Sequence, residues 1–233
     1  MKIGEISWTD FQKTSPSIAL LPTGSTEQHG PHAPMATDVI IAEAIAERAA
    51  EETETLLLPT IDIGVSQEHS NFPGSLSLPP EVFRAQLREI ILSASDSGIE
   101  KFVVVNGHGG NVSSIQEVCR DLYHNQDVKA IEWTWFNAIS SREMGHAGKL
   151  ETSLIMHLRE ELVGKPIEKG SGSWGQSLHG ARWDYDVKEF SENGVVGNPT
   201  EASGQKGEEL FDKSTEKLIN LIKSIRKGSL GDS

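Results

Sequence analysis

Short aliphatic runs alternate with helical patterns along most of the chain, and this order limits the possible folds. The runs that we expect to form strands are Ser17–Thr23, Thr55–Thr60, Lys101–Asn106 and Val128–Trp135. The segments with helical periodicity are Val39–Glu52, Glu81–Ser97, Val112–His124, Leu150–Glu160 and Gly207–Lys227. Strands separated by helices are typical of parallel sheets, because parallel strands need long crossovers. The sequence therefore predicts an α/β fold with a largely parallel sheet covered by helices on both faces.

The length and the loop content indicate one domain. A chain of 233 residues is within the size of a single core. Residues 164–204 are rich in Gly, Ser, Asn and Trp and predict long loops, which in a compact domain are usually functional or disordered. We therefore expect residues 1–233 to form a single domain with a loop-rich region before its last helix.

Charge and cysteine content exclude several classes of partner and site. The chain has 34 acidic and 21 basic residues, a formal net charge of -13, which repels nucleic acid and anionic membranes. It shows neither a signal-peptide pattern nor a run that could cross a bilayer, so we expect a cytoplasmic protein. The single cysteine, Cys119, excludes an internal disulfide and a thiolate zinc cluster. A metal would have to be held by His and carboxylate side chains.

Candidate metal ligands follow two of the predicted strands. Glu27, His29 and Asp38 lie in GSTEQHGPHAPMATD after the first strand, and His108 lies in VVVNGHGGN after the third. The carboxyl ends of parallel strands form one rim, where ligands bind in open α/β sheets. Glu27 and His29 are two residues apart, so in an extended segment they point to the same side. They could serve two adjacent metal ions bridged by Asp38, which is a recurring arrangement in hydrolytic enzymes.

Each of these residues also has a plainer interpretation. Asp38 could be the N-cap of the following helix. His32, flanked by prolines in the same segment, is more typical of a loop residue than of a ligand. The glycine-rich NGHGGN could cradle a phosphate, although Val112 stands where G-x-G-x-x-G needs its third glycine. The alternative interpretation is that these glycines let the backbone approach a metal cluster.

A third cluster is GHAGKLETS, residues 145–153. His146 is a candidate proton shuttle and Glu151 a candidate ligand or supporting carboxylate. Glu151 could instead cap or charge-compensate the start of a helix. A nucleophilic serine has no support, because the chain lacks G-x-S-x-G.

With these segments in place, the chain resembles the creatininase (creatinine amidohydrolase) family. The matching segments, in the family's order, are LPTGSTEQHGPHAPMATD, GVSQEHSNFPGSLSL, VNGHGGN, GHAGKLETS and GVVGNPTEASGQKG. The resemblance implies a single-domain three-layer α/β sandwich with a mostly parallel sheet. It also implies a binuclear metal site, hydrolysis of non-peptide or short-peptide amide bonds, and assembly into homo-oligomers such as hexamers.

The resemblance also implies roles for individual residues. Glu27 and His108 would hold one metal, His29 the other, and Asp38 would bridge them, while His146 matches the general acid/base. Creatinine-hydrolysing members carry a glutamate ligand where this chain has Gly110. Glu151 is our candidate to replace it.

Substrate recognition departs from the creatinine-hydrolysing members. Trp135 matches a pocket tryptophan, although it could equally be a core aromatic. Arg142 replaces the second pocket tryptophan and Gly145 an acidic residue. Arg142 suits an anionic group such as a carboxylate, and a loop could bring Trp174 or Trp183 into the pocket instead. Several segments are closer to the branch that includes the mycofactocin precursor peptide peptidase.

The leading hypothesis is a binuclear metal-dependent amidohydrolase that cleaves a C–N amide bond of a small substrate through a metal-bound hydroxide. The alternatives are a mycofactocin-type peptidase that removes a short C-terminal fragment, and a metal-binding or nucleotide-binding module without catalysis. We expect two divalent ions per chain, with zinc first and manganese or iron as alternatives, because His and carboxylate ligands suit all three.

Overall fold

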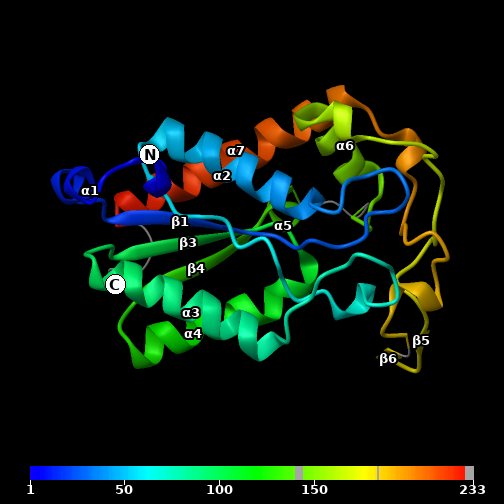
Figure 1. The fold of residues 1–233 in the computed structure, drawn as a ribbon, viewed down its shortest axis with the longest axis horizontal. Coiled ribbons are helices and arrows are strands. Elements are labelled where there is room, and N and C mark those ends of the chain that lie inside the picture. Colours follow the sequence, from blue (N-terminus) through cyan, green and yellow to red (C-terminus); the bar gives the residue numbers. More distant parts are fainter. Residues whose placement is uncertain (140–143, 183, 229–233) are drawn as a thin grey trace.

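The computed structural model describes residues 1–139, 144–182 and 184–228 of the chain (Figure 1). Its centre is a four-stranded sheet of order β2-β1-β3-β4 in which all neighbours are parallel. The strands are β1 (Ile18–Thr23), β2 (Leu56–Leu57), β3 (Lys101–Asn106) and β4 (Lys129–Thr134). Every residue of β1 is buried, as is typical of a parallel strand covered on both faces.

Helices cover both faces of the sheet, which confirms the predicted three-layer α/β sandwich. One layer contains α2 (Thr37–Thr53), α5 (Trp135–Ile139), α6 (Lys149–Leu158) and α7 (Gly204–Arg226). The other contains α3 (Pro80–Asp96) and α4 (Val112–Asn125), seen on the opposite side of the sheet in Figure 1. Neighbouring strand residues divide between the two cores: Leu20 faces α2 and α7, and Leu21 faces α3 and α4. This alternation follows from the two-residue period of a strand.

The observed elements differ most from the expected ones at the second strand, at Trp135 and before the sheet. The second strand is only two residues long and not Thr55–Thr60, although Leu58 and Ile61 still donate backbone hydrogen bonds to Leu20 and Pro22 of β1. Trp135 begins α5 and does not end β4. A further helix, α1 (Trp8–Thr14), precedes the sheet, N-capped by Ser7.

Short elements make up much of the rest of the described chain. They are the hairpin β5 (Ser177–Leu178) and β6 (Ala181–Arg182), and the single-turn helices η1 (Ile3–Glu5), η2 (Gln67–His69), η3 (Gly109–Asn111), η4 (Glu160–Leu162), η5 (Val187–Glu189) and η6 (Pro199–Glu201). The hairpin, η5 and η6 lie in the region predicted to be loop-rich. None of the helices in the described ranges combines the length and apolar character that crossing a membrane requires.

The ends of β1 and β3 stand level and position the loops that follow them. Thr23 pairs with Asn106 in the register, and the Thr23 hydroxyl donates to Oδ1 of Asn106 at 3.2 Å. The next residue, Gly107, allows close contact with the start of α2, since a Cβ there would stand 2.2 Å from the carbonyl oxygen of Asp38. Asp38 and the loop of His108 are thereby brought to one rim of the sheet.

Candidate metal centre and substrate cavity

Four predicted ligands meet at the carboxyl end of the sheet, and Asp38 stands between two of them. Oδ1 of Asp38 lies 3.2 Å from Nε2 of His29, and Oδ2 lies 3.0 Å from Nδ1 of His108. Oε1 of Glu27 lies 3.3 Å from the same His108 nitrogen. All four side chains are buried. One carboxylate thus presents one oxygen to each of two histidines, which is the placement that a bridging ligand needs.

Backbone contacts orient both histidine rings toward this carboxylate. Nε2 of His108 lies 2.9 Å from the carbonyl oxygen of Val65, and Nδ1 of His29 lies 3.2 Å from that of Glu27. A carbonyl oxygen only accepts, so each of these nitrogens carries the proton. The opposite nitrogen of each ring faces Asp38 and offers its lone pair to a metal whenever the ring is neutral. A backbone partner on the far side of the ring is typical of histidines that bind metals.

The donor set fits divalent metal ions. Several of its buried atoms have no hydrogen-bond partner apart from the ion-pair contacts within the cluster, namely both carboxylate oxygens of Glu27, Oδ2 of Asp38 and Nε2 of His29. Leaving such groups unpaired in the interior costs free energy, and buried polar atoms are generally satisfied. Glu27, His29 and Asp38 also place one ligand atom each within 4.8 Å of one another. Imidazole and carboxylate ligands without thiolate suit zinc or manganese.

The charges of the cluster are strongly coupled. Burial by itself lowers the pKa of His29, but the charges of Asp38, Glu151 and Glu27 outweigh burial and raise it to about 9. Burial raises the pKa of Glu151 to about 7, helped by Asp38 and opposed by His29. Burial also acts against ionised Glu27, yet His108 and His69 hold the pKa of that carboxyl well below its usual range. In the absence of metal, protons on the histidines therefore offset the buried carboxylates.

The structure contradicts one of the two interpretations of Asp38. It is the second residue of α2, whose N-cap is Ala36 and has no side-chain cap. The N-cap alternative is therefore wrong in this structure. The contacts of Glu151 are compatible with both of its interpretations: Oε2 accepts from the backbone N–H of Ala147 at 2.6 Å, at the start of α6. Glu151 also places a ligand atom within 4.8 Å of His29 and His146.

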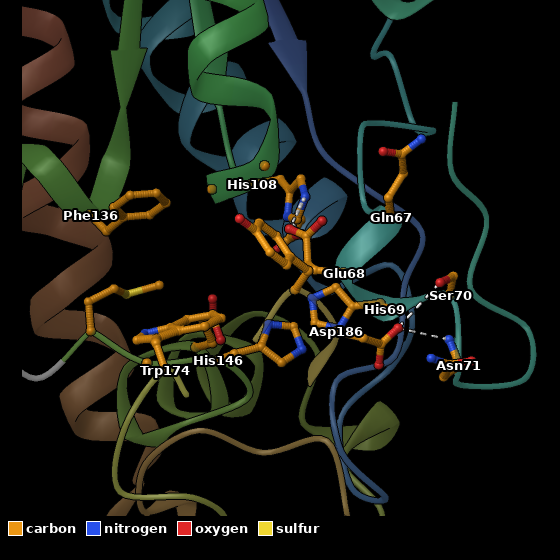
Figure 2. Close-up of a pocket in the computed structure, with 17 residues that line it drawn as sticks. Gln67, Glu68, His69, Ser70, Asn71, His108, Phe136, His146, Trp174 and Asp186 are labelled. Carbon is orange, nitrogen blue, oxygen red and sulfur yellow. Dashed lines mark hydrogen bonds and ion pairs between the residues drawn. The ribbon is translucent and has the colours of Figure 1, made fainter. Parts of the chain in front are cut away.

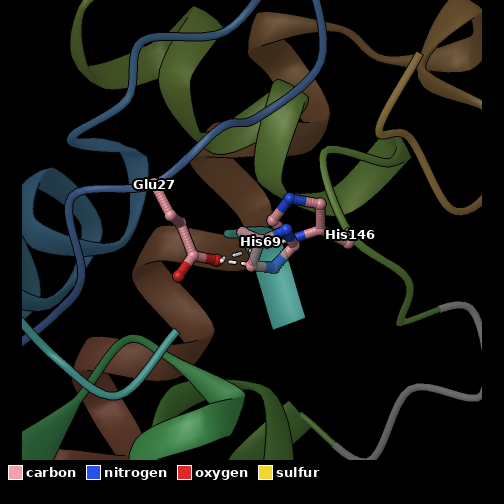
Figure 3. Close-up of side chains that lie close together, drawn as sticks. All are labelled: Glu27, His69 and His146. Carbon is pink, nitrogen blue, oxygen red and sulfur yellow. Dashed lines mark ion pairs between the residues drawn. The ribbon is translucent and has the colours of Figure 1, made fainter. Parts of the chain in front are cut away.

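His146 joins the cluster together with two residues to which the sequence analysis gave no role, His69 and Gln28. Oε1 of Glu27 lies 3.1 Å from Nε2 of His69 and 3.8 Å from Nδ1 of His146 (Figure 3). The rings of His69 and His146 stack with centroids 4.3 Å apart. Nε2 of Gln28 lies 2.9 Å from Nδ1 of His69. In the sequence, His69 is marked only by its place in GVSQEHSNFPGSLSL, one of the segments that resemble the creatininase family.

A cavity of about 800 Å³ opens over these residues (Figure 2). Phe136 and Trp174 line one side, and the Trp174 ring lies 6.2 Å from that of His146. Glu68 and Tyr185 also line it, and Tyr185 is 75% exposed. The cavity therefore joins the candidate metal centre to a partly aromatic opening.

Of the two residues predicted to bind substrate, only Trp135 is described, and it does not line this cavity. Trp135 is fully buried in the core against α6 and α7, so its position is that of the core aromatic, and its neighbour Phe136 lines the cavity. Arg142 lies outside the described residues. Trp174, considered as an alternative, does line the cavity.

The contacts of His32 and of two glycines in NGHGGN indicate structural roles. The ring of His32 is buried, and its Nε2 lies 2.9 Å from the Thr152 hydroxyl. Two of the glycines of NGHGGN, Gly107 and Gly110, lie where other backbone segments approach, whereas a Cβ at Gly109 would meet nothing within 4 Å. A Cβ at Gly107 would meet the Asp38 carbonyl, and one at Gly110 would stand 2.1 Å from the Val65 carbonyl oxygen.

Comparison with known proteins assigns the family. The creatininase family model, described as creatinine amidohydrolase, matches residues 4–222. The chain belongs to the creatininase family. Mycofactocin precursor peptide peptidase of Mycobacterium ulcerans is 32% identical over 231 residues, which cover 95% of this chain and 90% of the relative. Creatinine amidohydrolase of Pseudomonas putida is 28% identical over 189 residues, covering 69% and 73%.

Solved creatininase structures share the fold of this chain. A manganese creatininase matches with a TM-score of 0.83 at 24% identity over 96% of this chain and 97% of its own. The higher identity and wider coverage of the peptidase confirm that this creatininase-family hydrolase stands nearer to the mycofactocin-peptidase branch than to creatinine amidohydrolase.

Proposed function

We propose that this creatininase-family hydrolase is a binuclear metal-dependent amidohydrolase that cleaves a C–N amide bond of a small substrate. The observation that carries the proposal is the position of Asp38, with one oxygen facing His29 and the other facing His108. Two histidines on opposite oxygens of one buried carboxylate are the arrangement expected around a pair of ions. A single ion would leave one of these nitrogens unused.

The remaining carboxylates complete two donor sets. Glu27 and His108 with Asp38 would hold one ion, and His29 and Glu151 with Asp38 would hold the other. Zinc is the first expectation, and manganese or iron suits the same ligands. When bound, such ions supply an activated water and polarise the scissile carbonyl.

The chain itself supplies the proton transfer through His146. Burial and the neighbouring His29 and His69 hold the pKa of His146 well below its usual range, against the opposing effect of Glu27. Its ring is therefore neutral near neutral pH, with Nδ1 turned to the centre. A neutral imidazole in this position accepts a proton from water and donates it to the departing nitrogen. Phe136 and Trp174 exclude water from one side of the cavity.

A second candidate activity is that of a peptidase that removes a short C-terminal fragment from a modified peptide. The identity to mycofactocin precursor peptide peptidases and the cavity of about 800 Å³ favour it. A cavity of this size accommodates more than a small ring. Arg142 would then anchor a carboxylate of the substrate, and Trp135 would support the wall from behind through Phe136.

Metal analysis with a substrate panel tests the proposal. Chelator-treated protein should regain turnover only when two equivalents of zinc or manganese are restored, and Glu151→Gln should lose the second. A glutamine at position 151 keeps a side-chain oxygen that accepts from the Ala147 N–H, so the start of α6 should be unchanged. Only the negative charge of residue 151 is lost. Comparing small amides with C-terminal peptide amides by product mass separates the two activities. One ion with full turnover, or none, contradicts the binuclear centre.

The wider context of the enzyme completes the proposal. We expect residues 1–233 to act as a single amidohydrolase domain in the cytoplasm, assembled as a homo-oligomer such as a hexamer. Trp8, 77% exposed on α1, is an apolar side chain that an assembly would cover.

A further inference from the structure

We infer that Gln28 is a positioning residue that determines which ring nitrogen carries the proton in His69 and in His146. It leaves the proton of His69 on the nitrogen that faces the centre and that of His146 on the nitrogen that faces away, and so keeps His69 out of the metal coordination. The inference rests on the proposed metal centre, because it says which of the clustered histidines bind the ions. Glu27, His69 and His146 by themselves have the spacing of a metal site, as other groups of the cluster do, with ligand atoms within 4.8 Å of one another. Distances alone therefore leave the role of His69 open.

Two backbone groups fix the orientation of the Gln28 side-chain amide. The N–H of Gly30 donates to Oε1 at 2.9 Å, and Nε2 donates to the carbonyl oxygen of Gly194 at 3.0 Å. A backbone N–H only donates and a carbonyl only accepts, so exchanging the amide oxygen and nitrogen would place like groups against each other at both contacts. The end of Gln28 that faces the histidines is therefore the NH₂ group.

The orientation of Gln28 sets the proton of His69. The amide nitrogen of Gln28 also lies 2.9 Å from Nδ1 of His69 and 3.0 Å from Nε2 of His146. Nε2 of His146 lies 2.7 Å from the Gln28 carbonyl oxygen, which only accepts, so this nitrogen carries a proton and cannot accept from the amide. The second amide hydrogen therefore goes to Nδ1 of His69, which accepts. The ring proton then stands on Nε2, which lies 3.1 Å from Oε1 of Glu27. A nitrogen that carries a proton has no lone pair for a metal. His69 therefore presents an N–H to the Glu27 carboxylate and orients it, as residues behind a metal ligand commonly do.

The main chain of Gln28 sets His146 the other way. Nε2 of His146 lies 2.7 Å from the Gln28 carbonyl oxygen, which only accepts, so this nitrogen carries the proton. The lone pair of His146 is on Nδ1, which faces Glu27 at 3.8 Å (Figure 3). His69 thus presents a donor N–H to the centre, and His146, whose ring stacks on that of His69, presents an acceptor nitrogen. Only the acceptor, His146, can take a proton from water.

The surroundings of Gln28 hold it in this place. Its side chain is nearly buried, and its backbone N–H donates to the Ser75 hydroxyl at 3.0 Å. Gly194 has φ of +80°, and a Cβ there would stand 2.0 Å from Oε1 of Gln28. The loop-rich region before η6 therefore supplies the backbone acceptor that orients Gln28.

Nuclear magnetic resonance on protein with isotope-labelled histidines tests the inference directly. The protein is loaded with a spin-active cadmium isotope, whose coupling to a ring nitrogen identifies a ligand. We expect coupling to His29 and His108 and none to His69. The spectra of metal-free protein should show His69 with its proton on Nε2, so the proton assignment is tested whatever the metal count. A metal count below two would contradict the proposed centre and leave this assignment standing.

Variants of Gln28 test its positioning role. Gln28→Glu replaces the NH₂ group by an acceptor oxygen, so the His69 proton should move to Nδ1 and metal affinity should fall by about 10- to 100-fold. Gln28→Met removes the donor without adding an acceptor and serves if the first variant folds poorly. Ser75→Ala, which loses a contact to the Gln28 backbone only, is the matched control and should leave the His69 signal unchanged. Cadmium coupling to His69, or an unchanged His69 signal in both Gln28 variants, would overturn the inference.

Discussion

The carboxylate of Glu68 lies where a side chain at position 110 would have to stand. A Cβ on Gly110 would be 2.9 Å from Oε1 of Glu68 and 2.1 Å from the carbonyl oxygen of Val65. That carbonyl also accepts from Nε2 of His108. The glutamate that creatinine-hydrolysing members carry at this position therefore cannot be accommodated here without moving the segment that orients His108.

Gly110→Glu should consequently fail to add a third carboxylate to the metal centre. The new side chain should displace Val65, loosen His108 and lower both the thermal midpoint and the metal content. Gly109→Ala is the matched control, because nothing lies within 4 Å of a Cβ there. Calorimetry and metal analysis of both variants check this. A stable Gly110→Glu protein with tighter metal binding would contradict it.

Asp38→Ala should remove both metals or leave one weakly bound, because Asp38 faces His29 and His108 at once. Loss of an N-cap would instead cost about 1 kcal/mol and leave the metal content alone. The N-cap of α2 is Ala36, so no cap is lost in this variant. Metal stoichiometry on the folded variant decides, and two retained metals would rule out the bridging role.

The stability of metal-free protein should fall as the pH rises. The pKa of Glu151, raised to about 7, and that of His29, raised to about 9, both exceed their unfolded values. A group whose folded pKa is raised stabilises the protein below its unfolded pKa, and this contribution is lost as pH rises through the folded pKa. The window therefore runs from about 4.5, where unfolded Glu151 ionises, to about 9. In its lower part, up to 6.5, the lowered pKa values of His146 and His32 act in the opposite direction, so the fall is clearest above that pH.

Metal binding should reverse this trend, because bound ligands are deprotonated and their protons are released. Thermal midpoints of chelator-treated and metal-loaded protein at about pH 6 and about pH 9 test this directly. Glu151→Gln should remove the part of the decline that occurs through about pH 7. A metal-free midpoint that rises across the window would contradict the expected charge coupling.

His146→Ala should keep both metals and lose turnover by about 100-fold or more, the usual contribution of a general acid or base. Its Nε2 is held by the carbonyl of Gln28, and Nδ1 faces Glu27 at 3.8 Å. His29→Ala is the comparison, since loss of a ligand should lower metal content and turnover together. Unchanged turnover in His146→Ala on an accepted substrate would remove this residue from the mechanism.

The sequence predicts those residues of the site whose positions follow from the topology of the sheet. Glu27, His29 and His108 could be located because they directly follow β1 and β3, whose ends meet in any parallel sheet. His69 could not, because η2 follows a two-residue strand and a long irregular segment. That segment is held by tertiary hydrogen bonds such as Leu76 N–H to the Thr26 carbonyl. Such contacts leave no periodic pattern in the sequence.

Trp135 shows a second kind of limit. It stands at the junction of a buried strand and a short helix in the same core, and its aromatic character fits either a pocket or a core. Whether a ring faces the cavity is decided by the turn between β4 and α5. The sequence pattern therefore predicted an aromatic near the site but not that Phe136 would provide it.

We expect creatinine to be a poor substrate of this protein. Position 145, which is acidic in creatinine-hydrolysing members, cannot carry a side chain here, since a Cβ would stand 1.9 Å from the Val196 carbonyl oxygen. The cavity of about 800 Å³ is far larger than a small flat ring, and Trp174 at its edge is 42% exposed. Binding energy from an aromatic wall depends on burying the ligand against it, which a small ring in a wide cavity does not achieve.

Peptide-like amides that fill the cavity should therefore be favoured. Trp174→Ala should weaken turnover of such an amide more than that of creatinine, because only the larger substrate reaches both Trp174 and the metal centre. Steady-state assays of the metal-loaded protein with both substrates measure this difference. A kcat/KM for creatinine of about 10⁴ M⁻¹s⁻¹ or above, within the usual range of enzymes on their own substrates, would show that the cavity closes around a small ring after all.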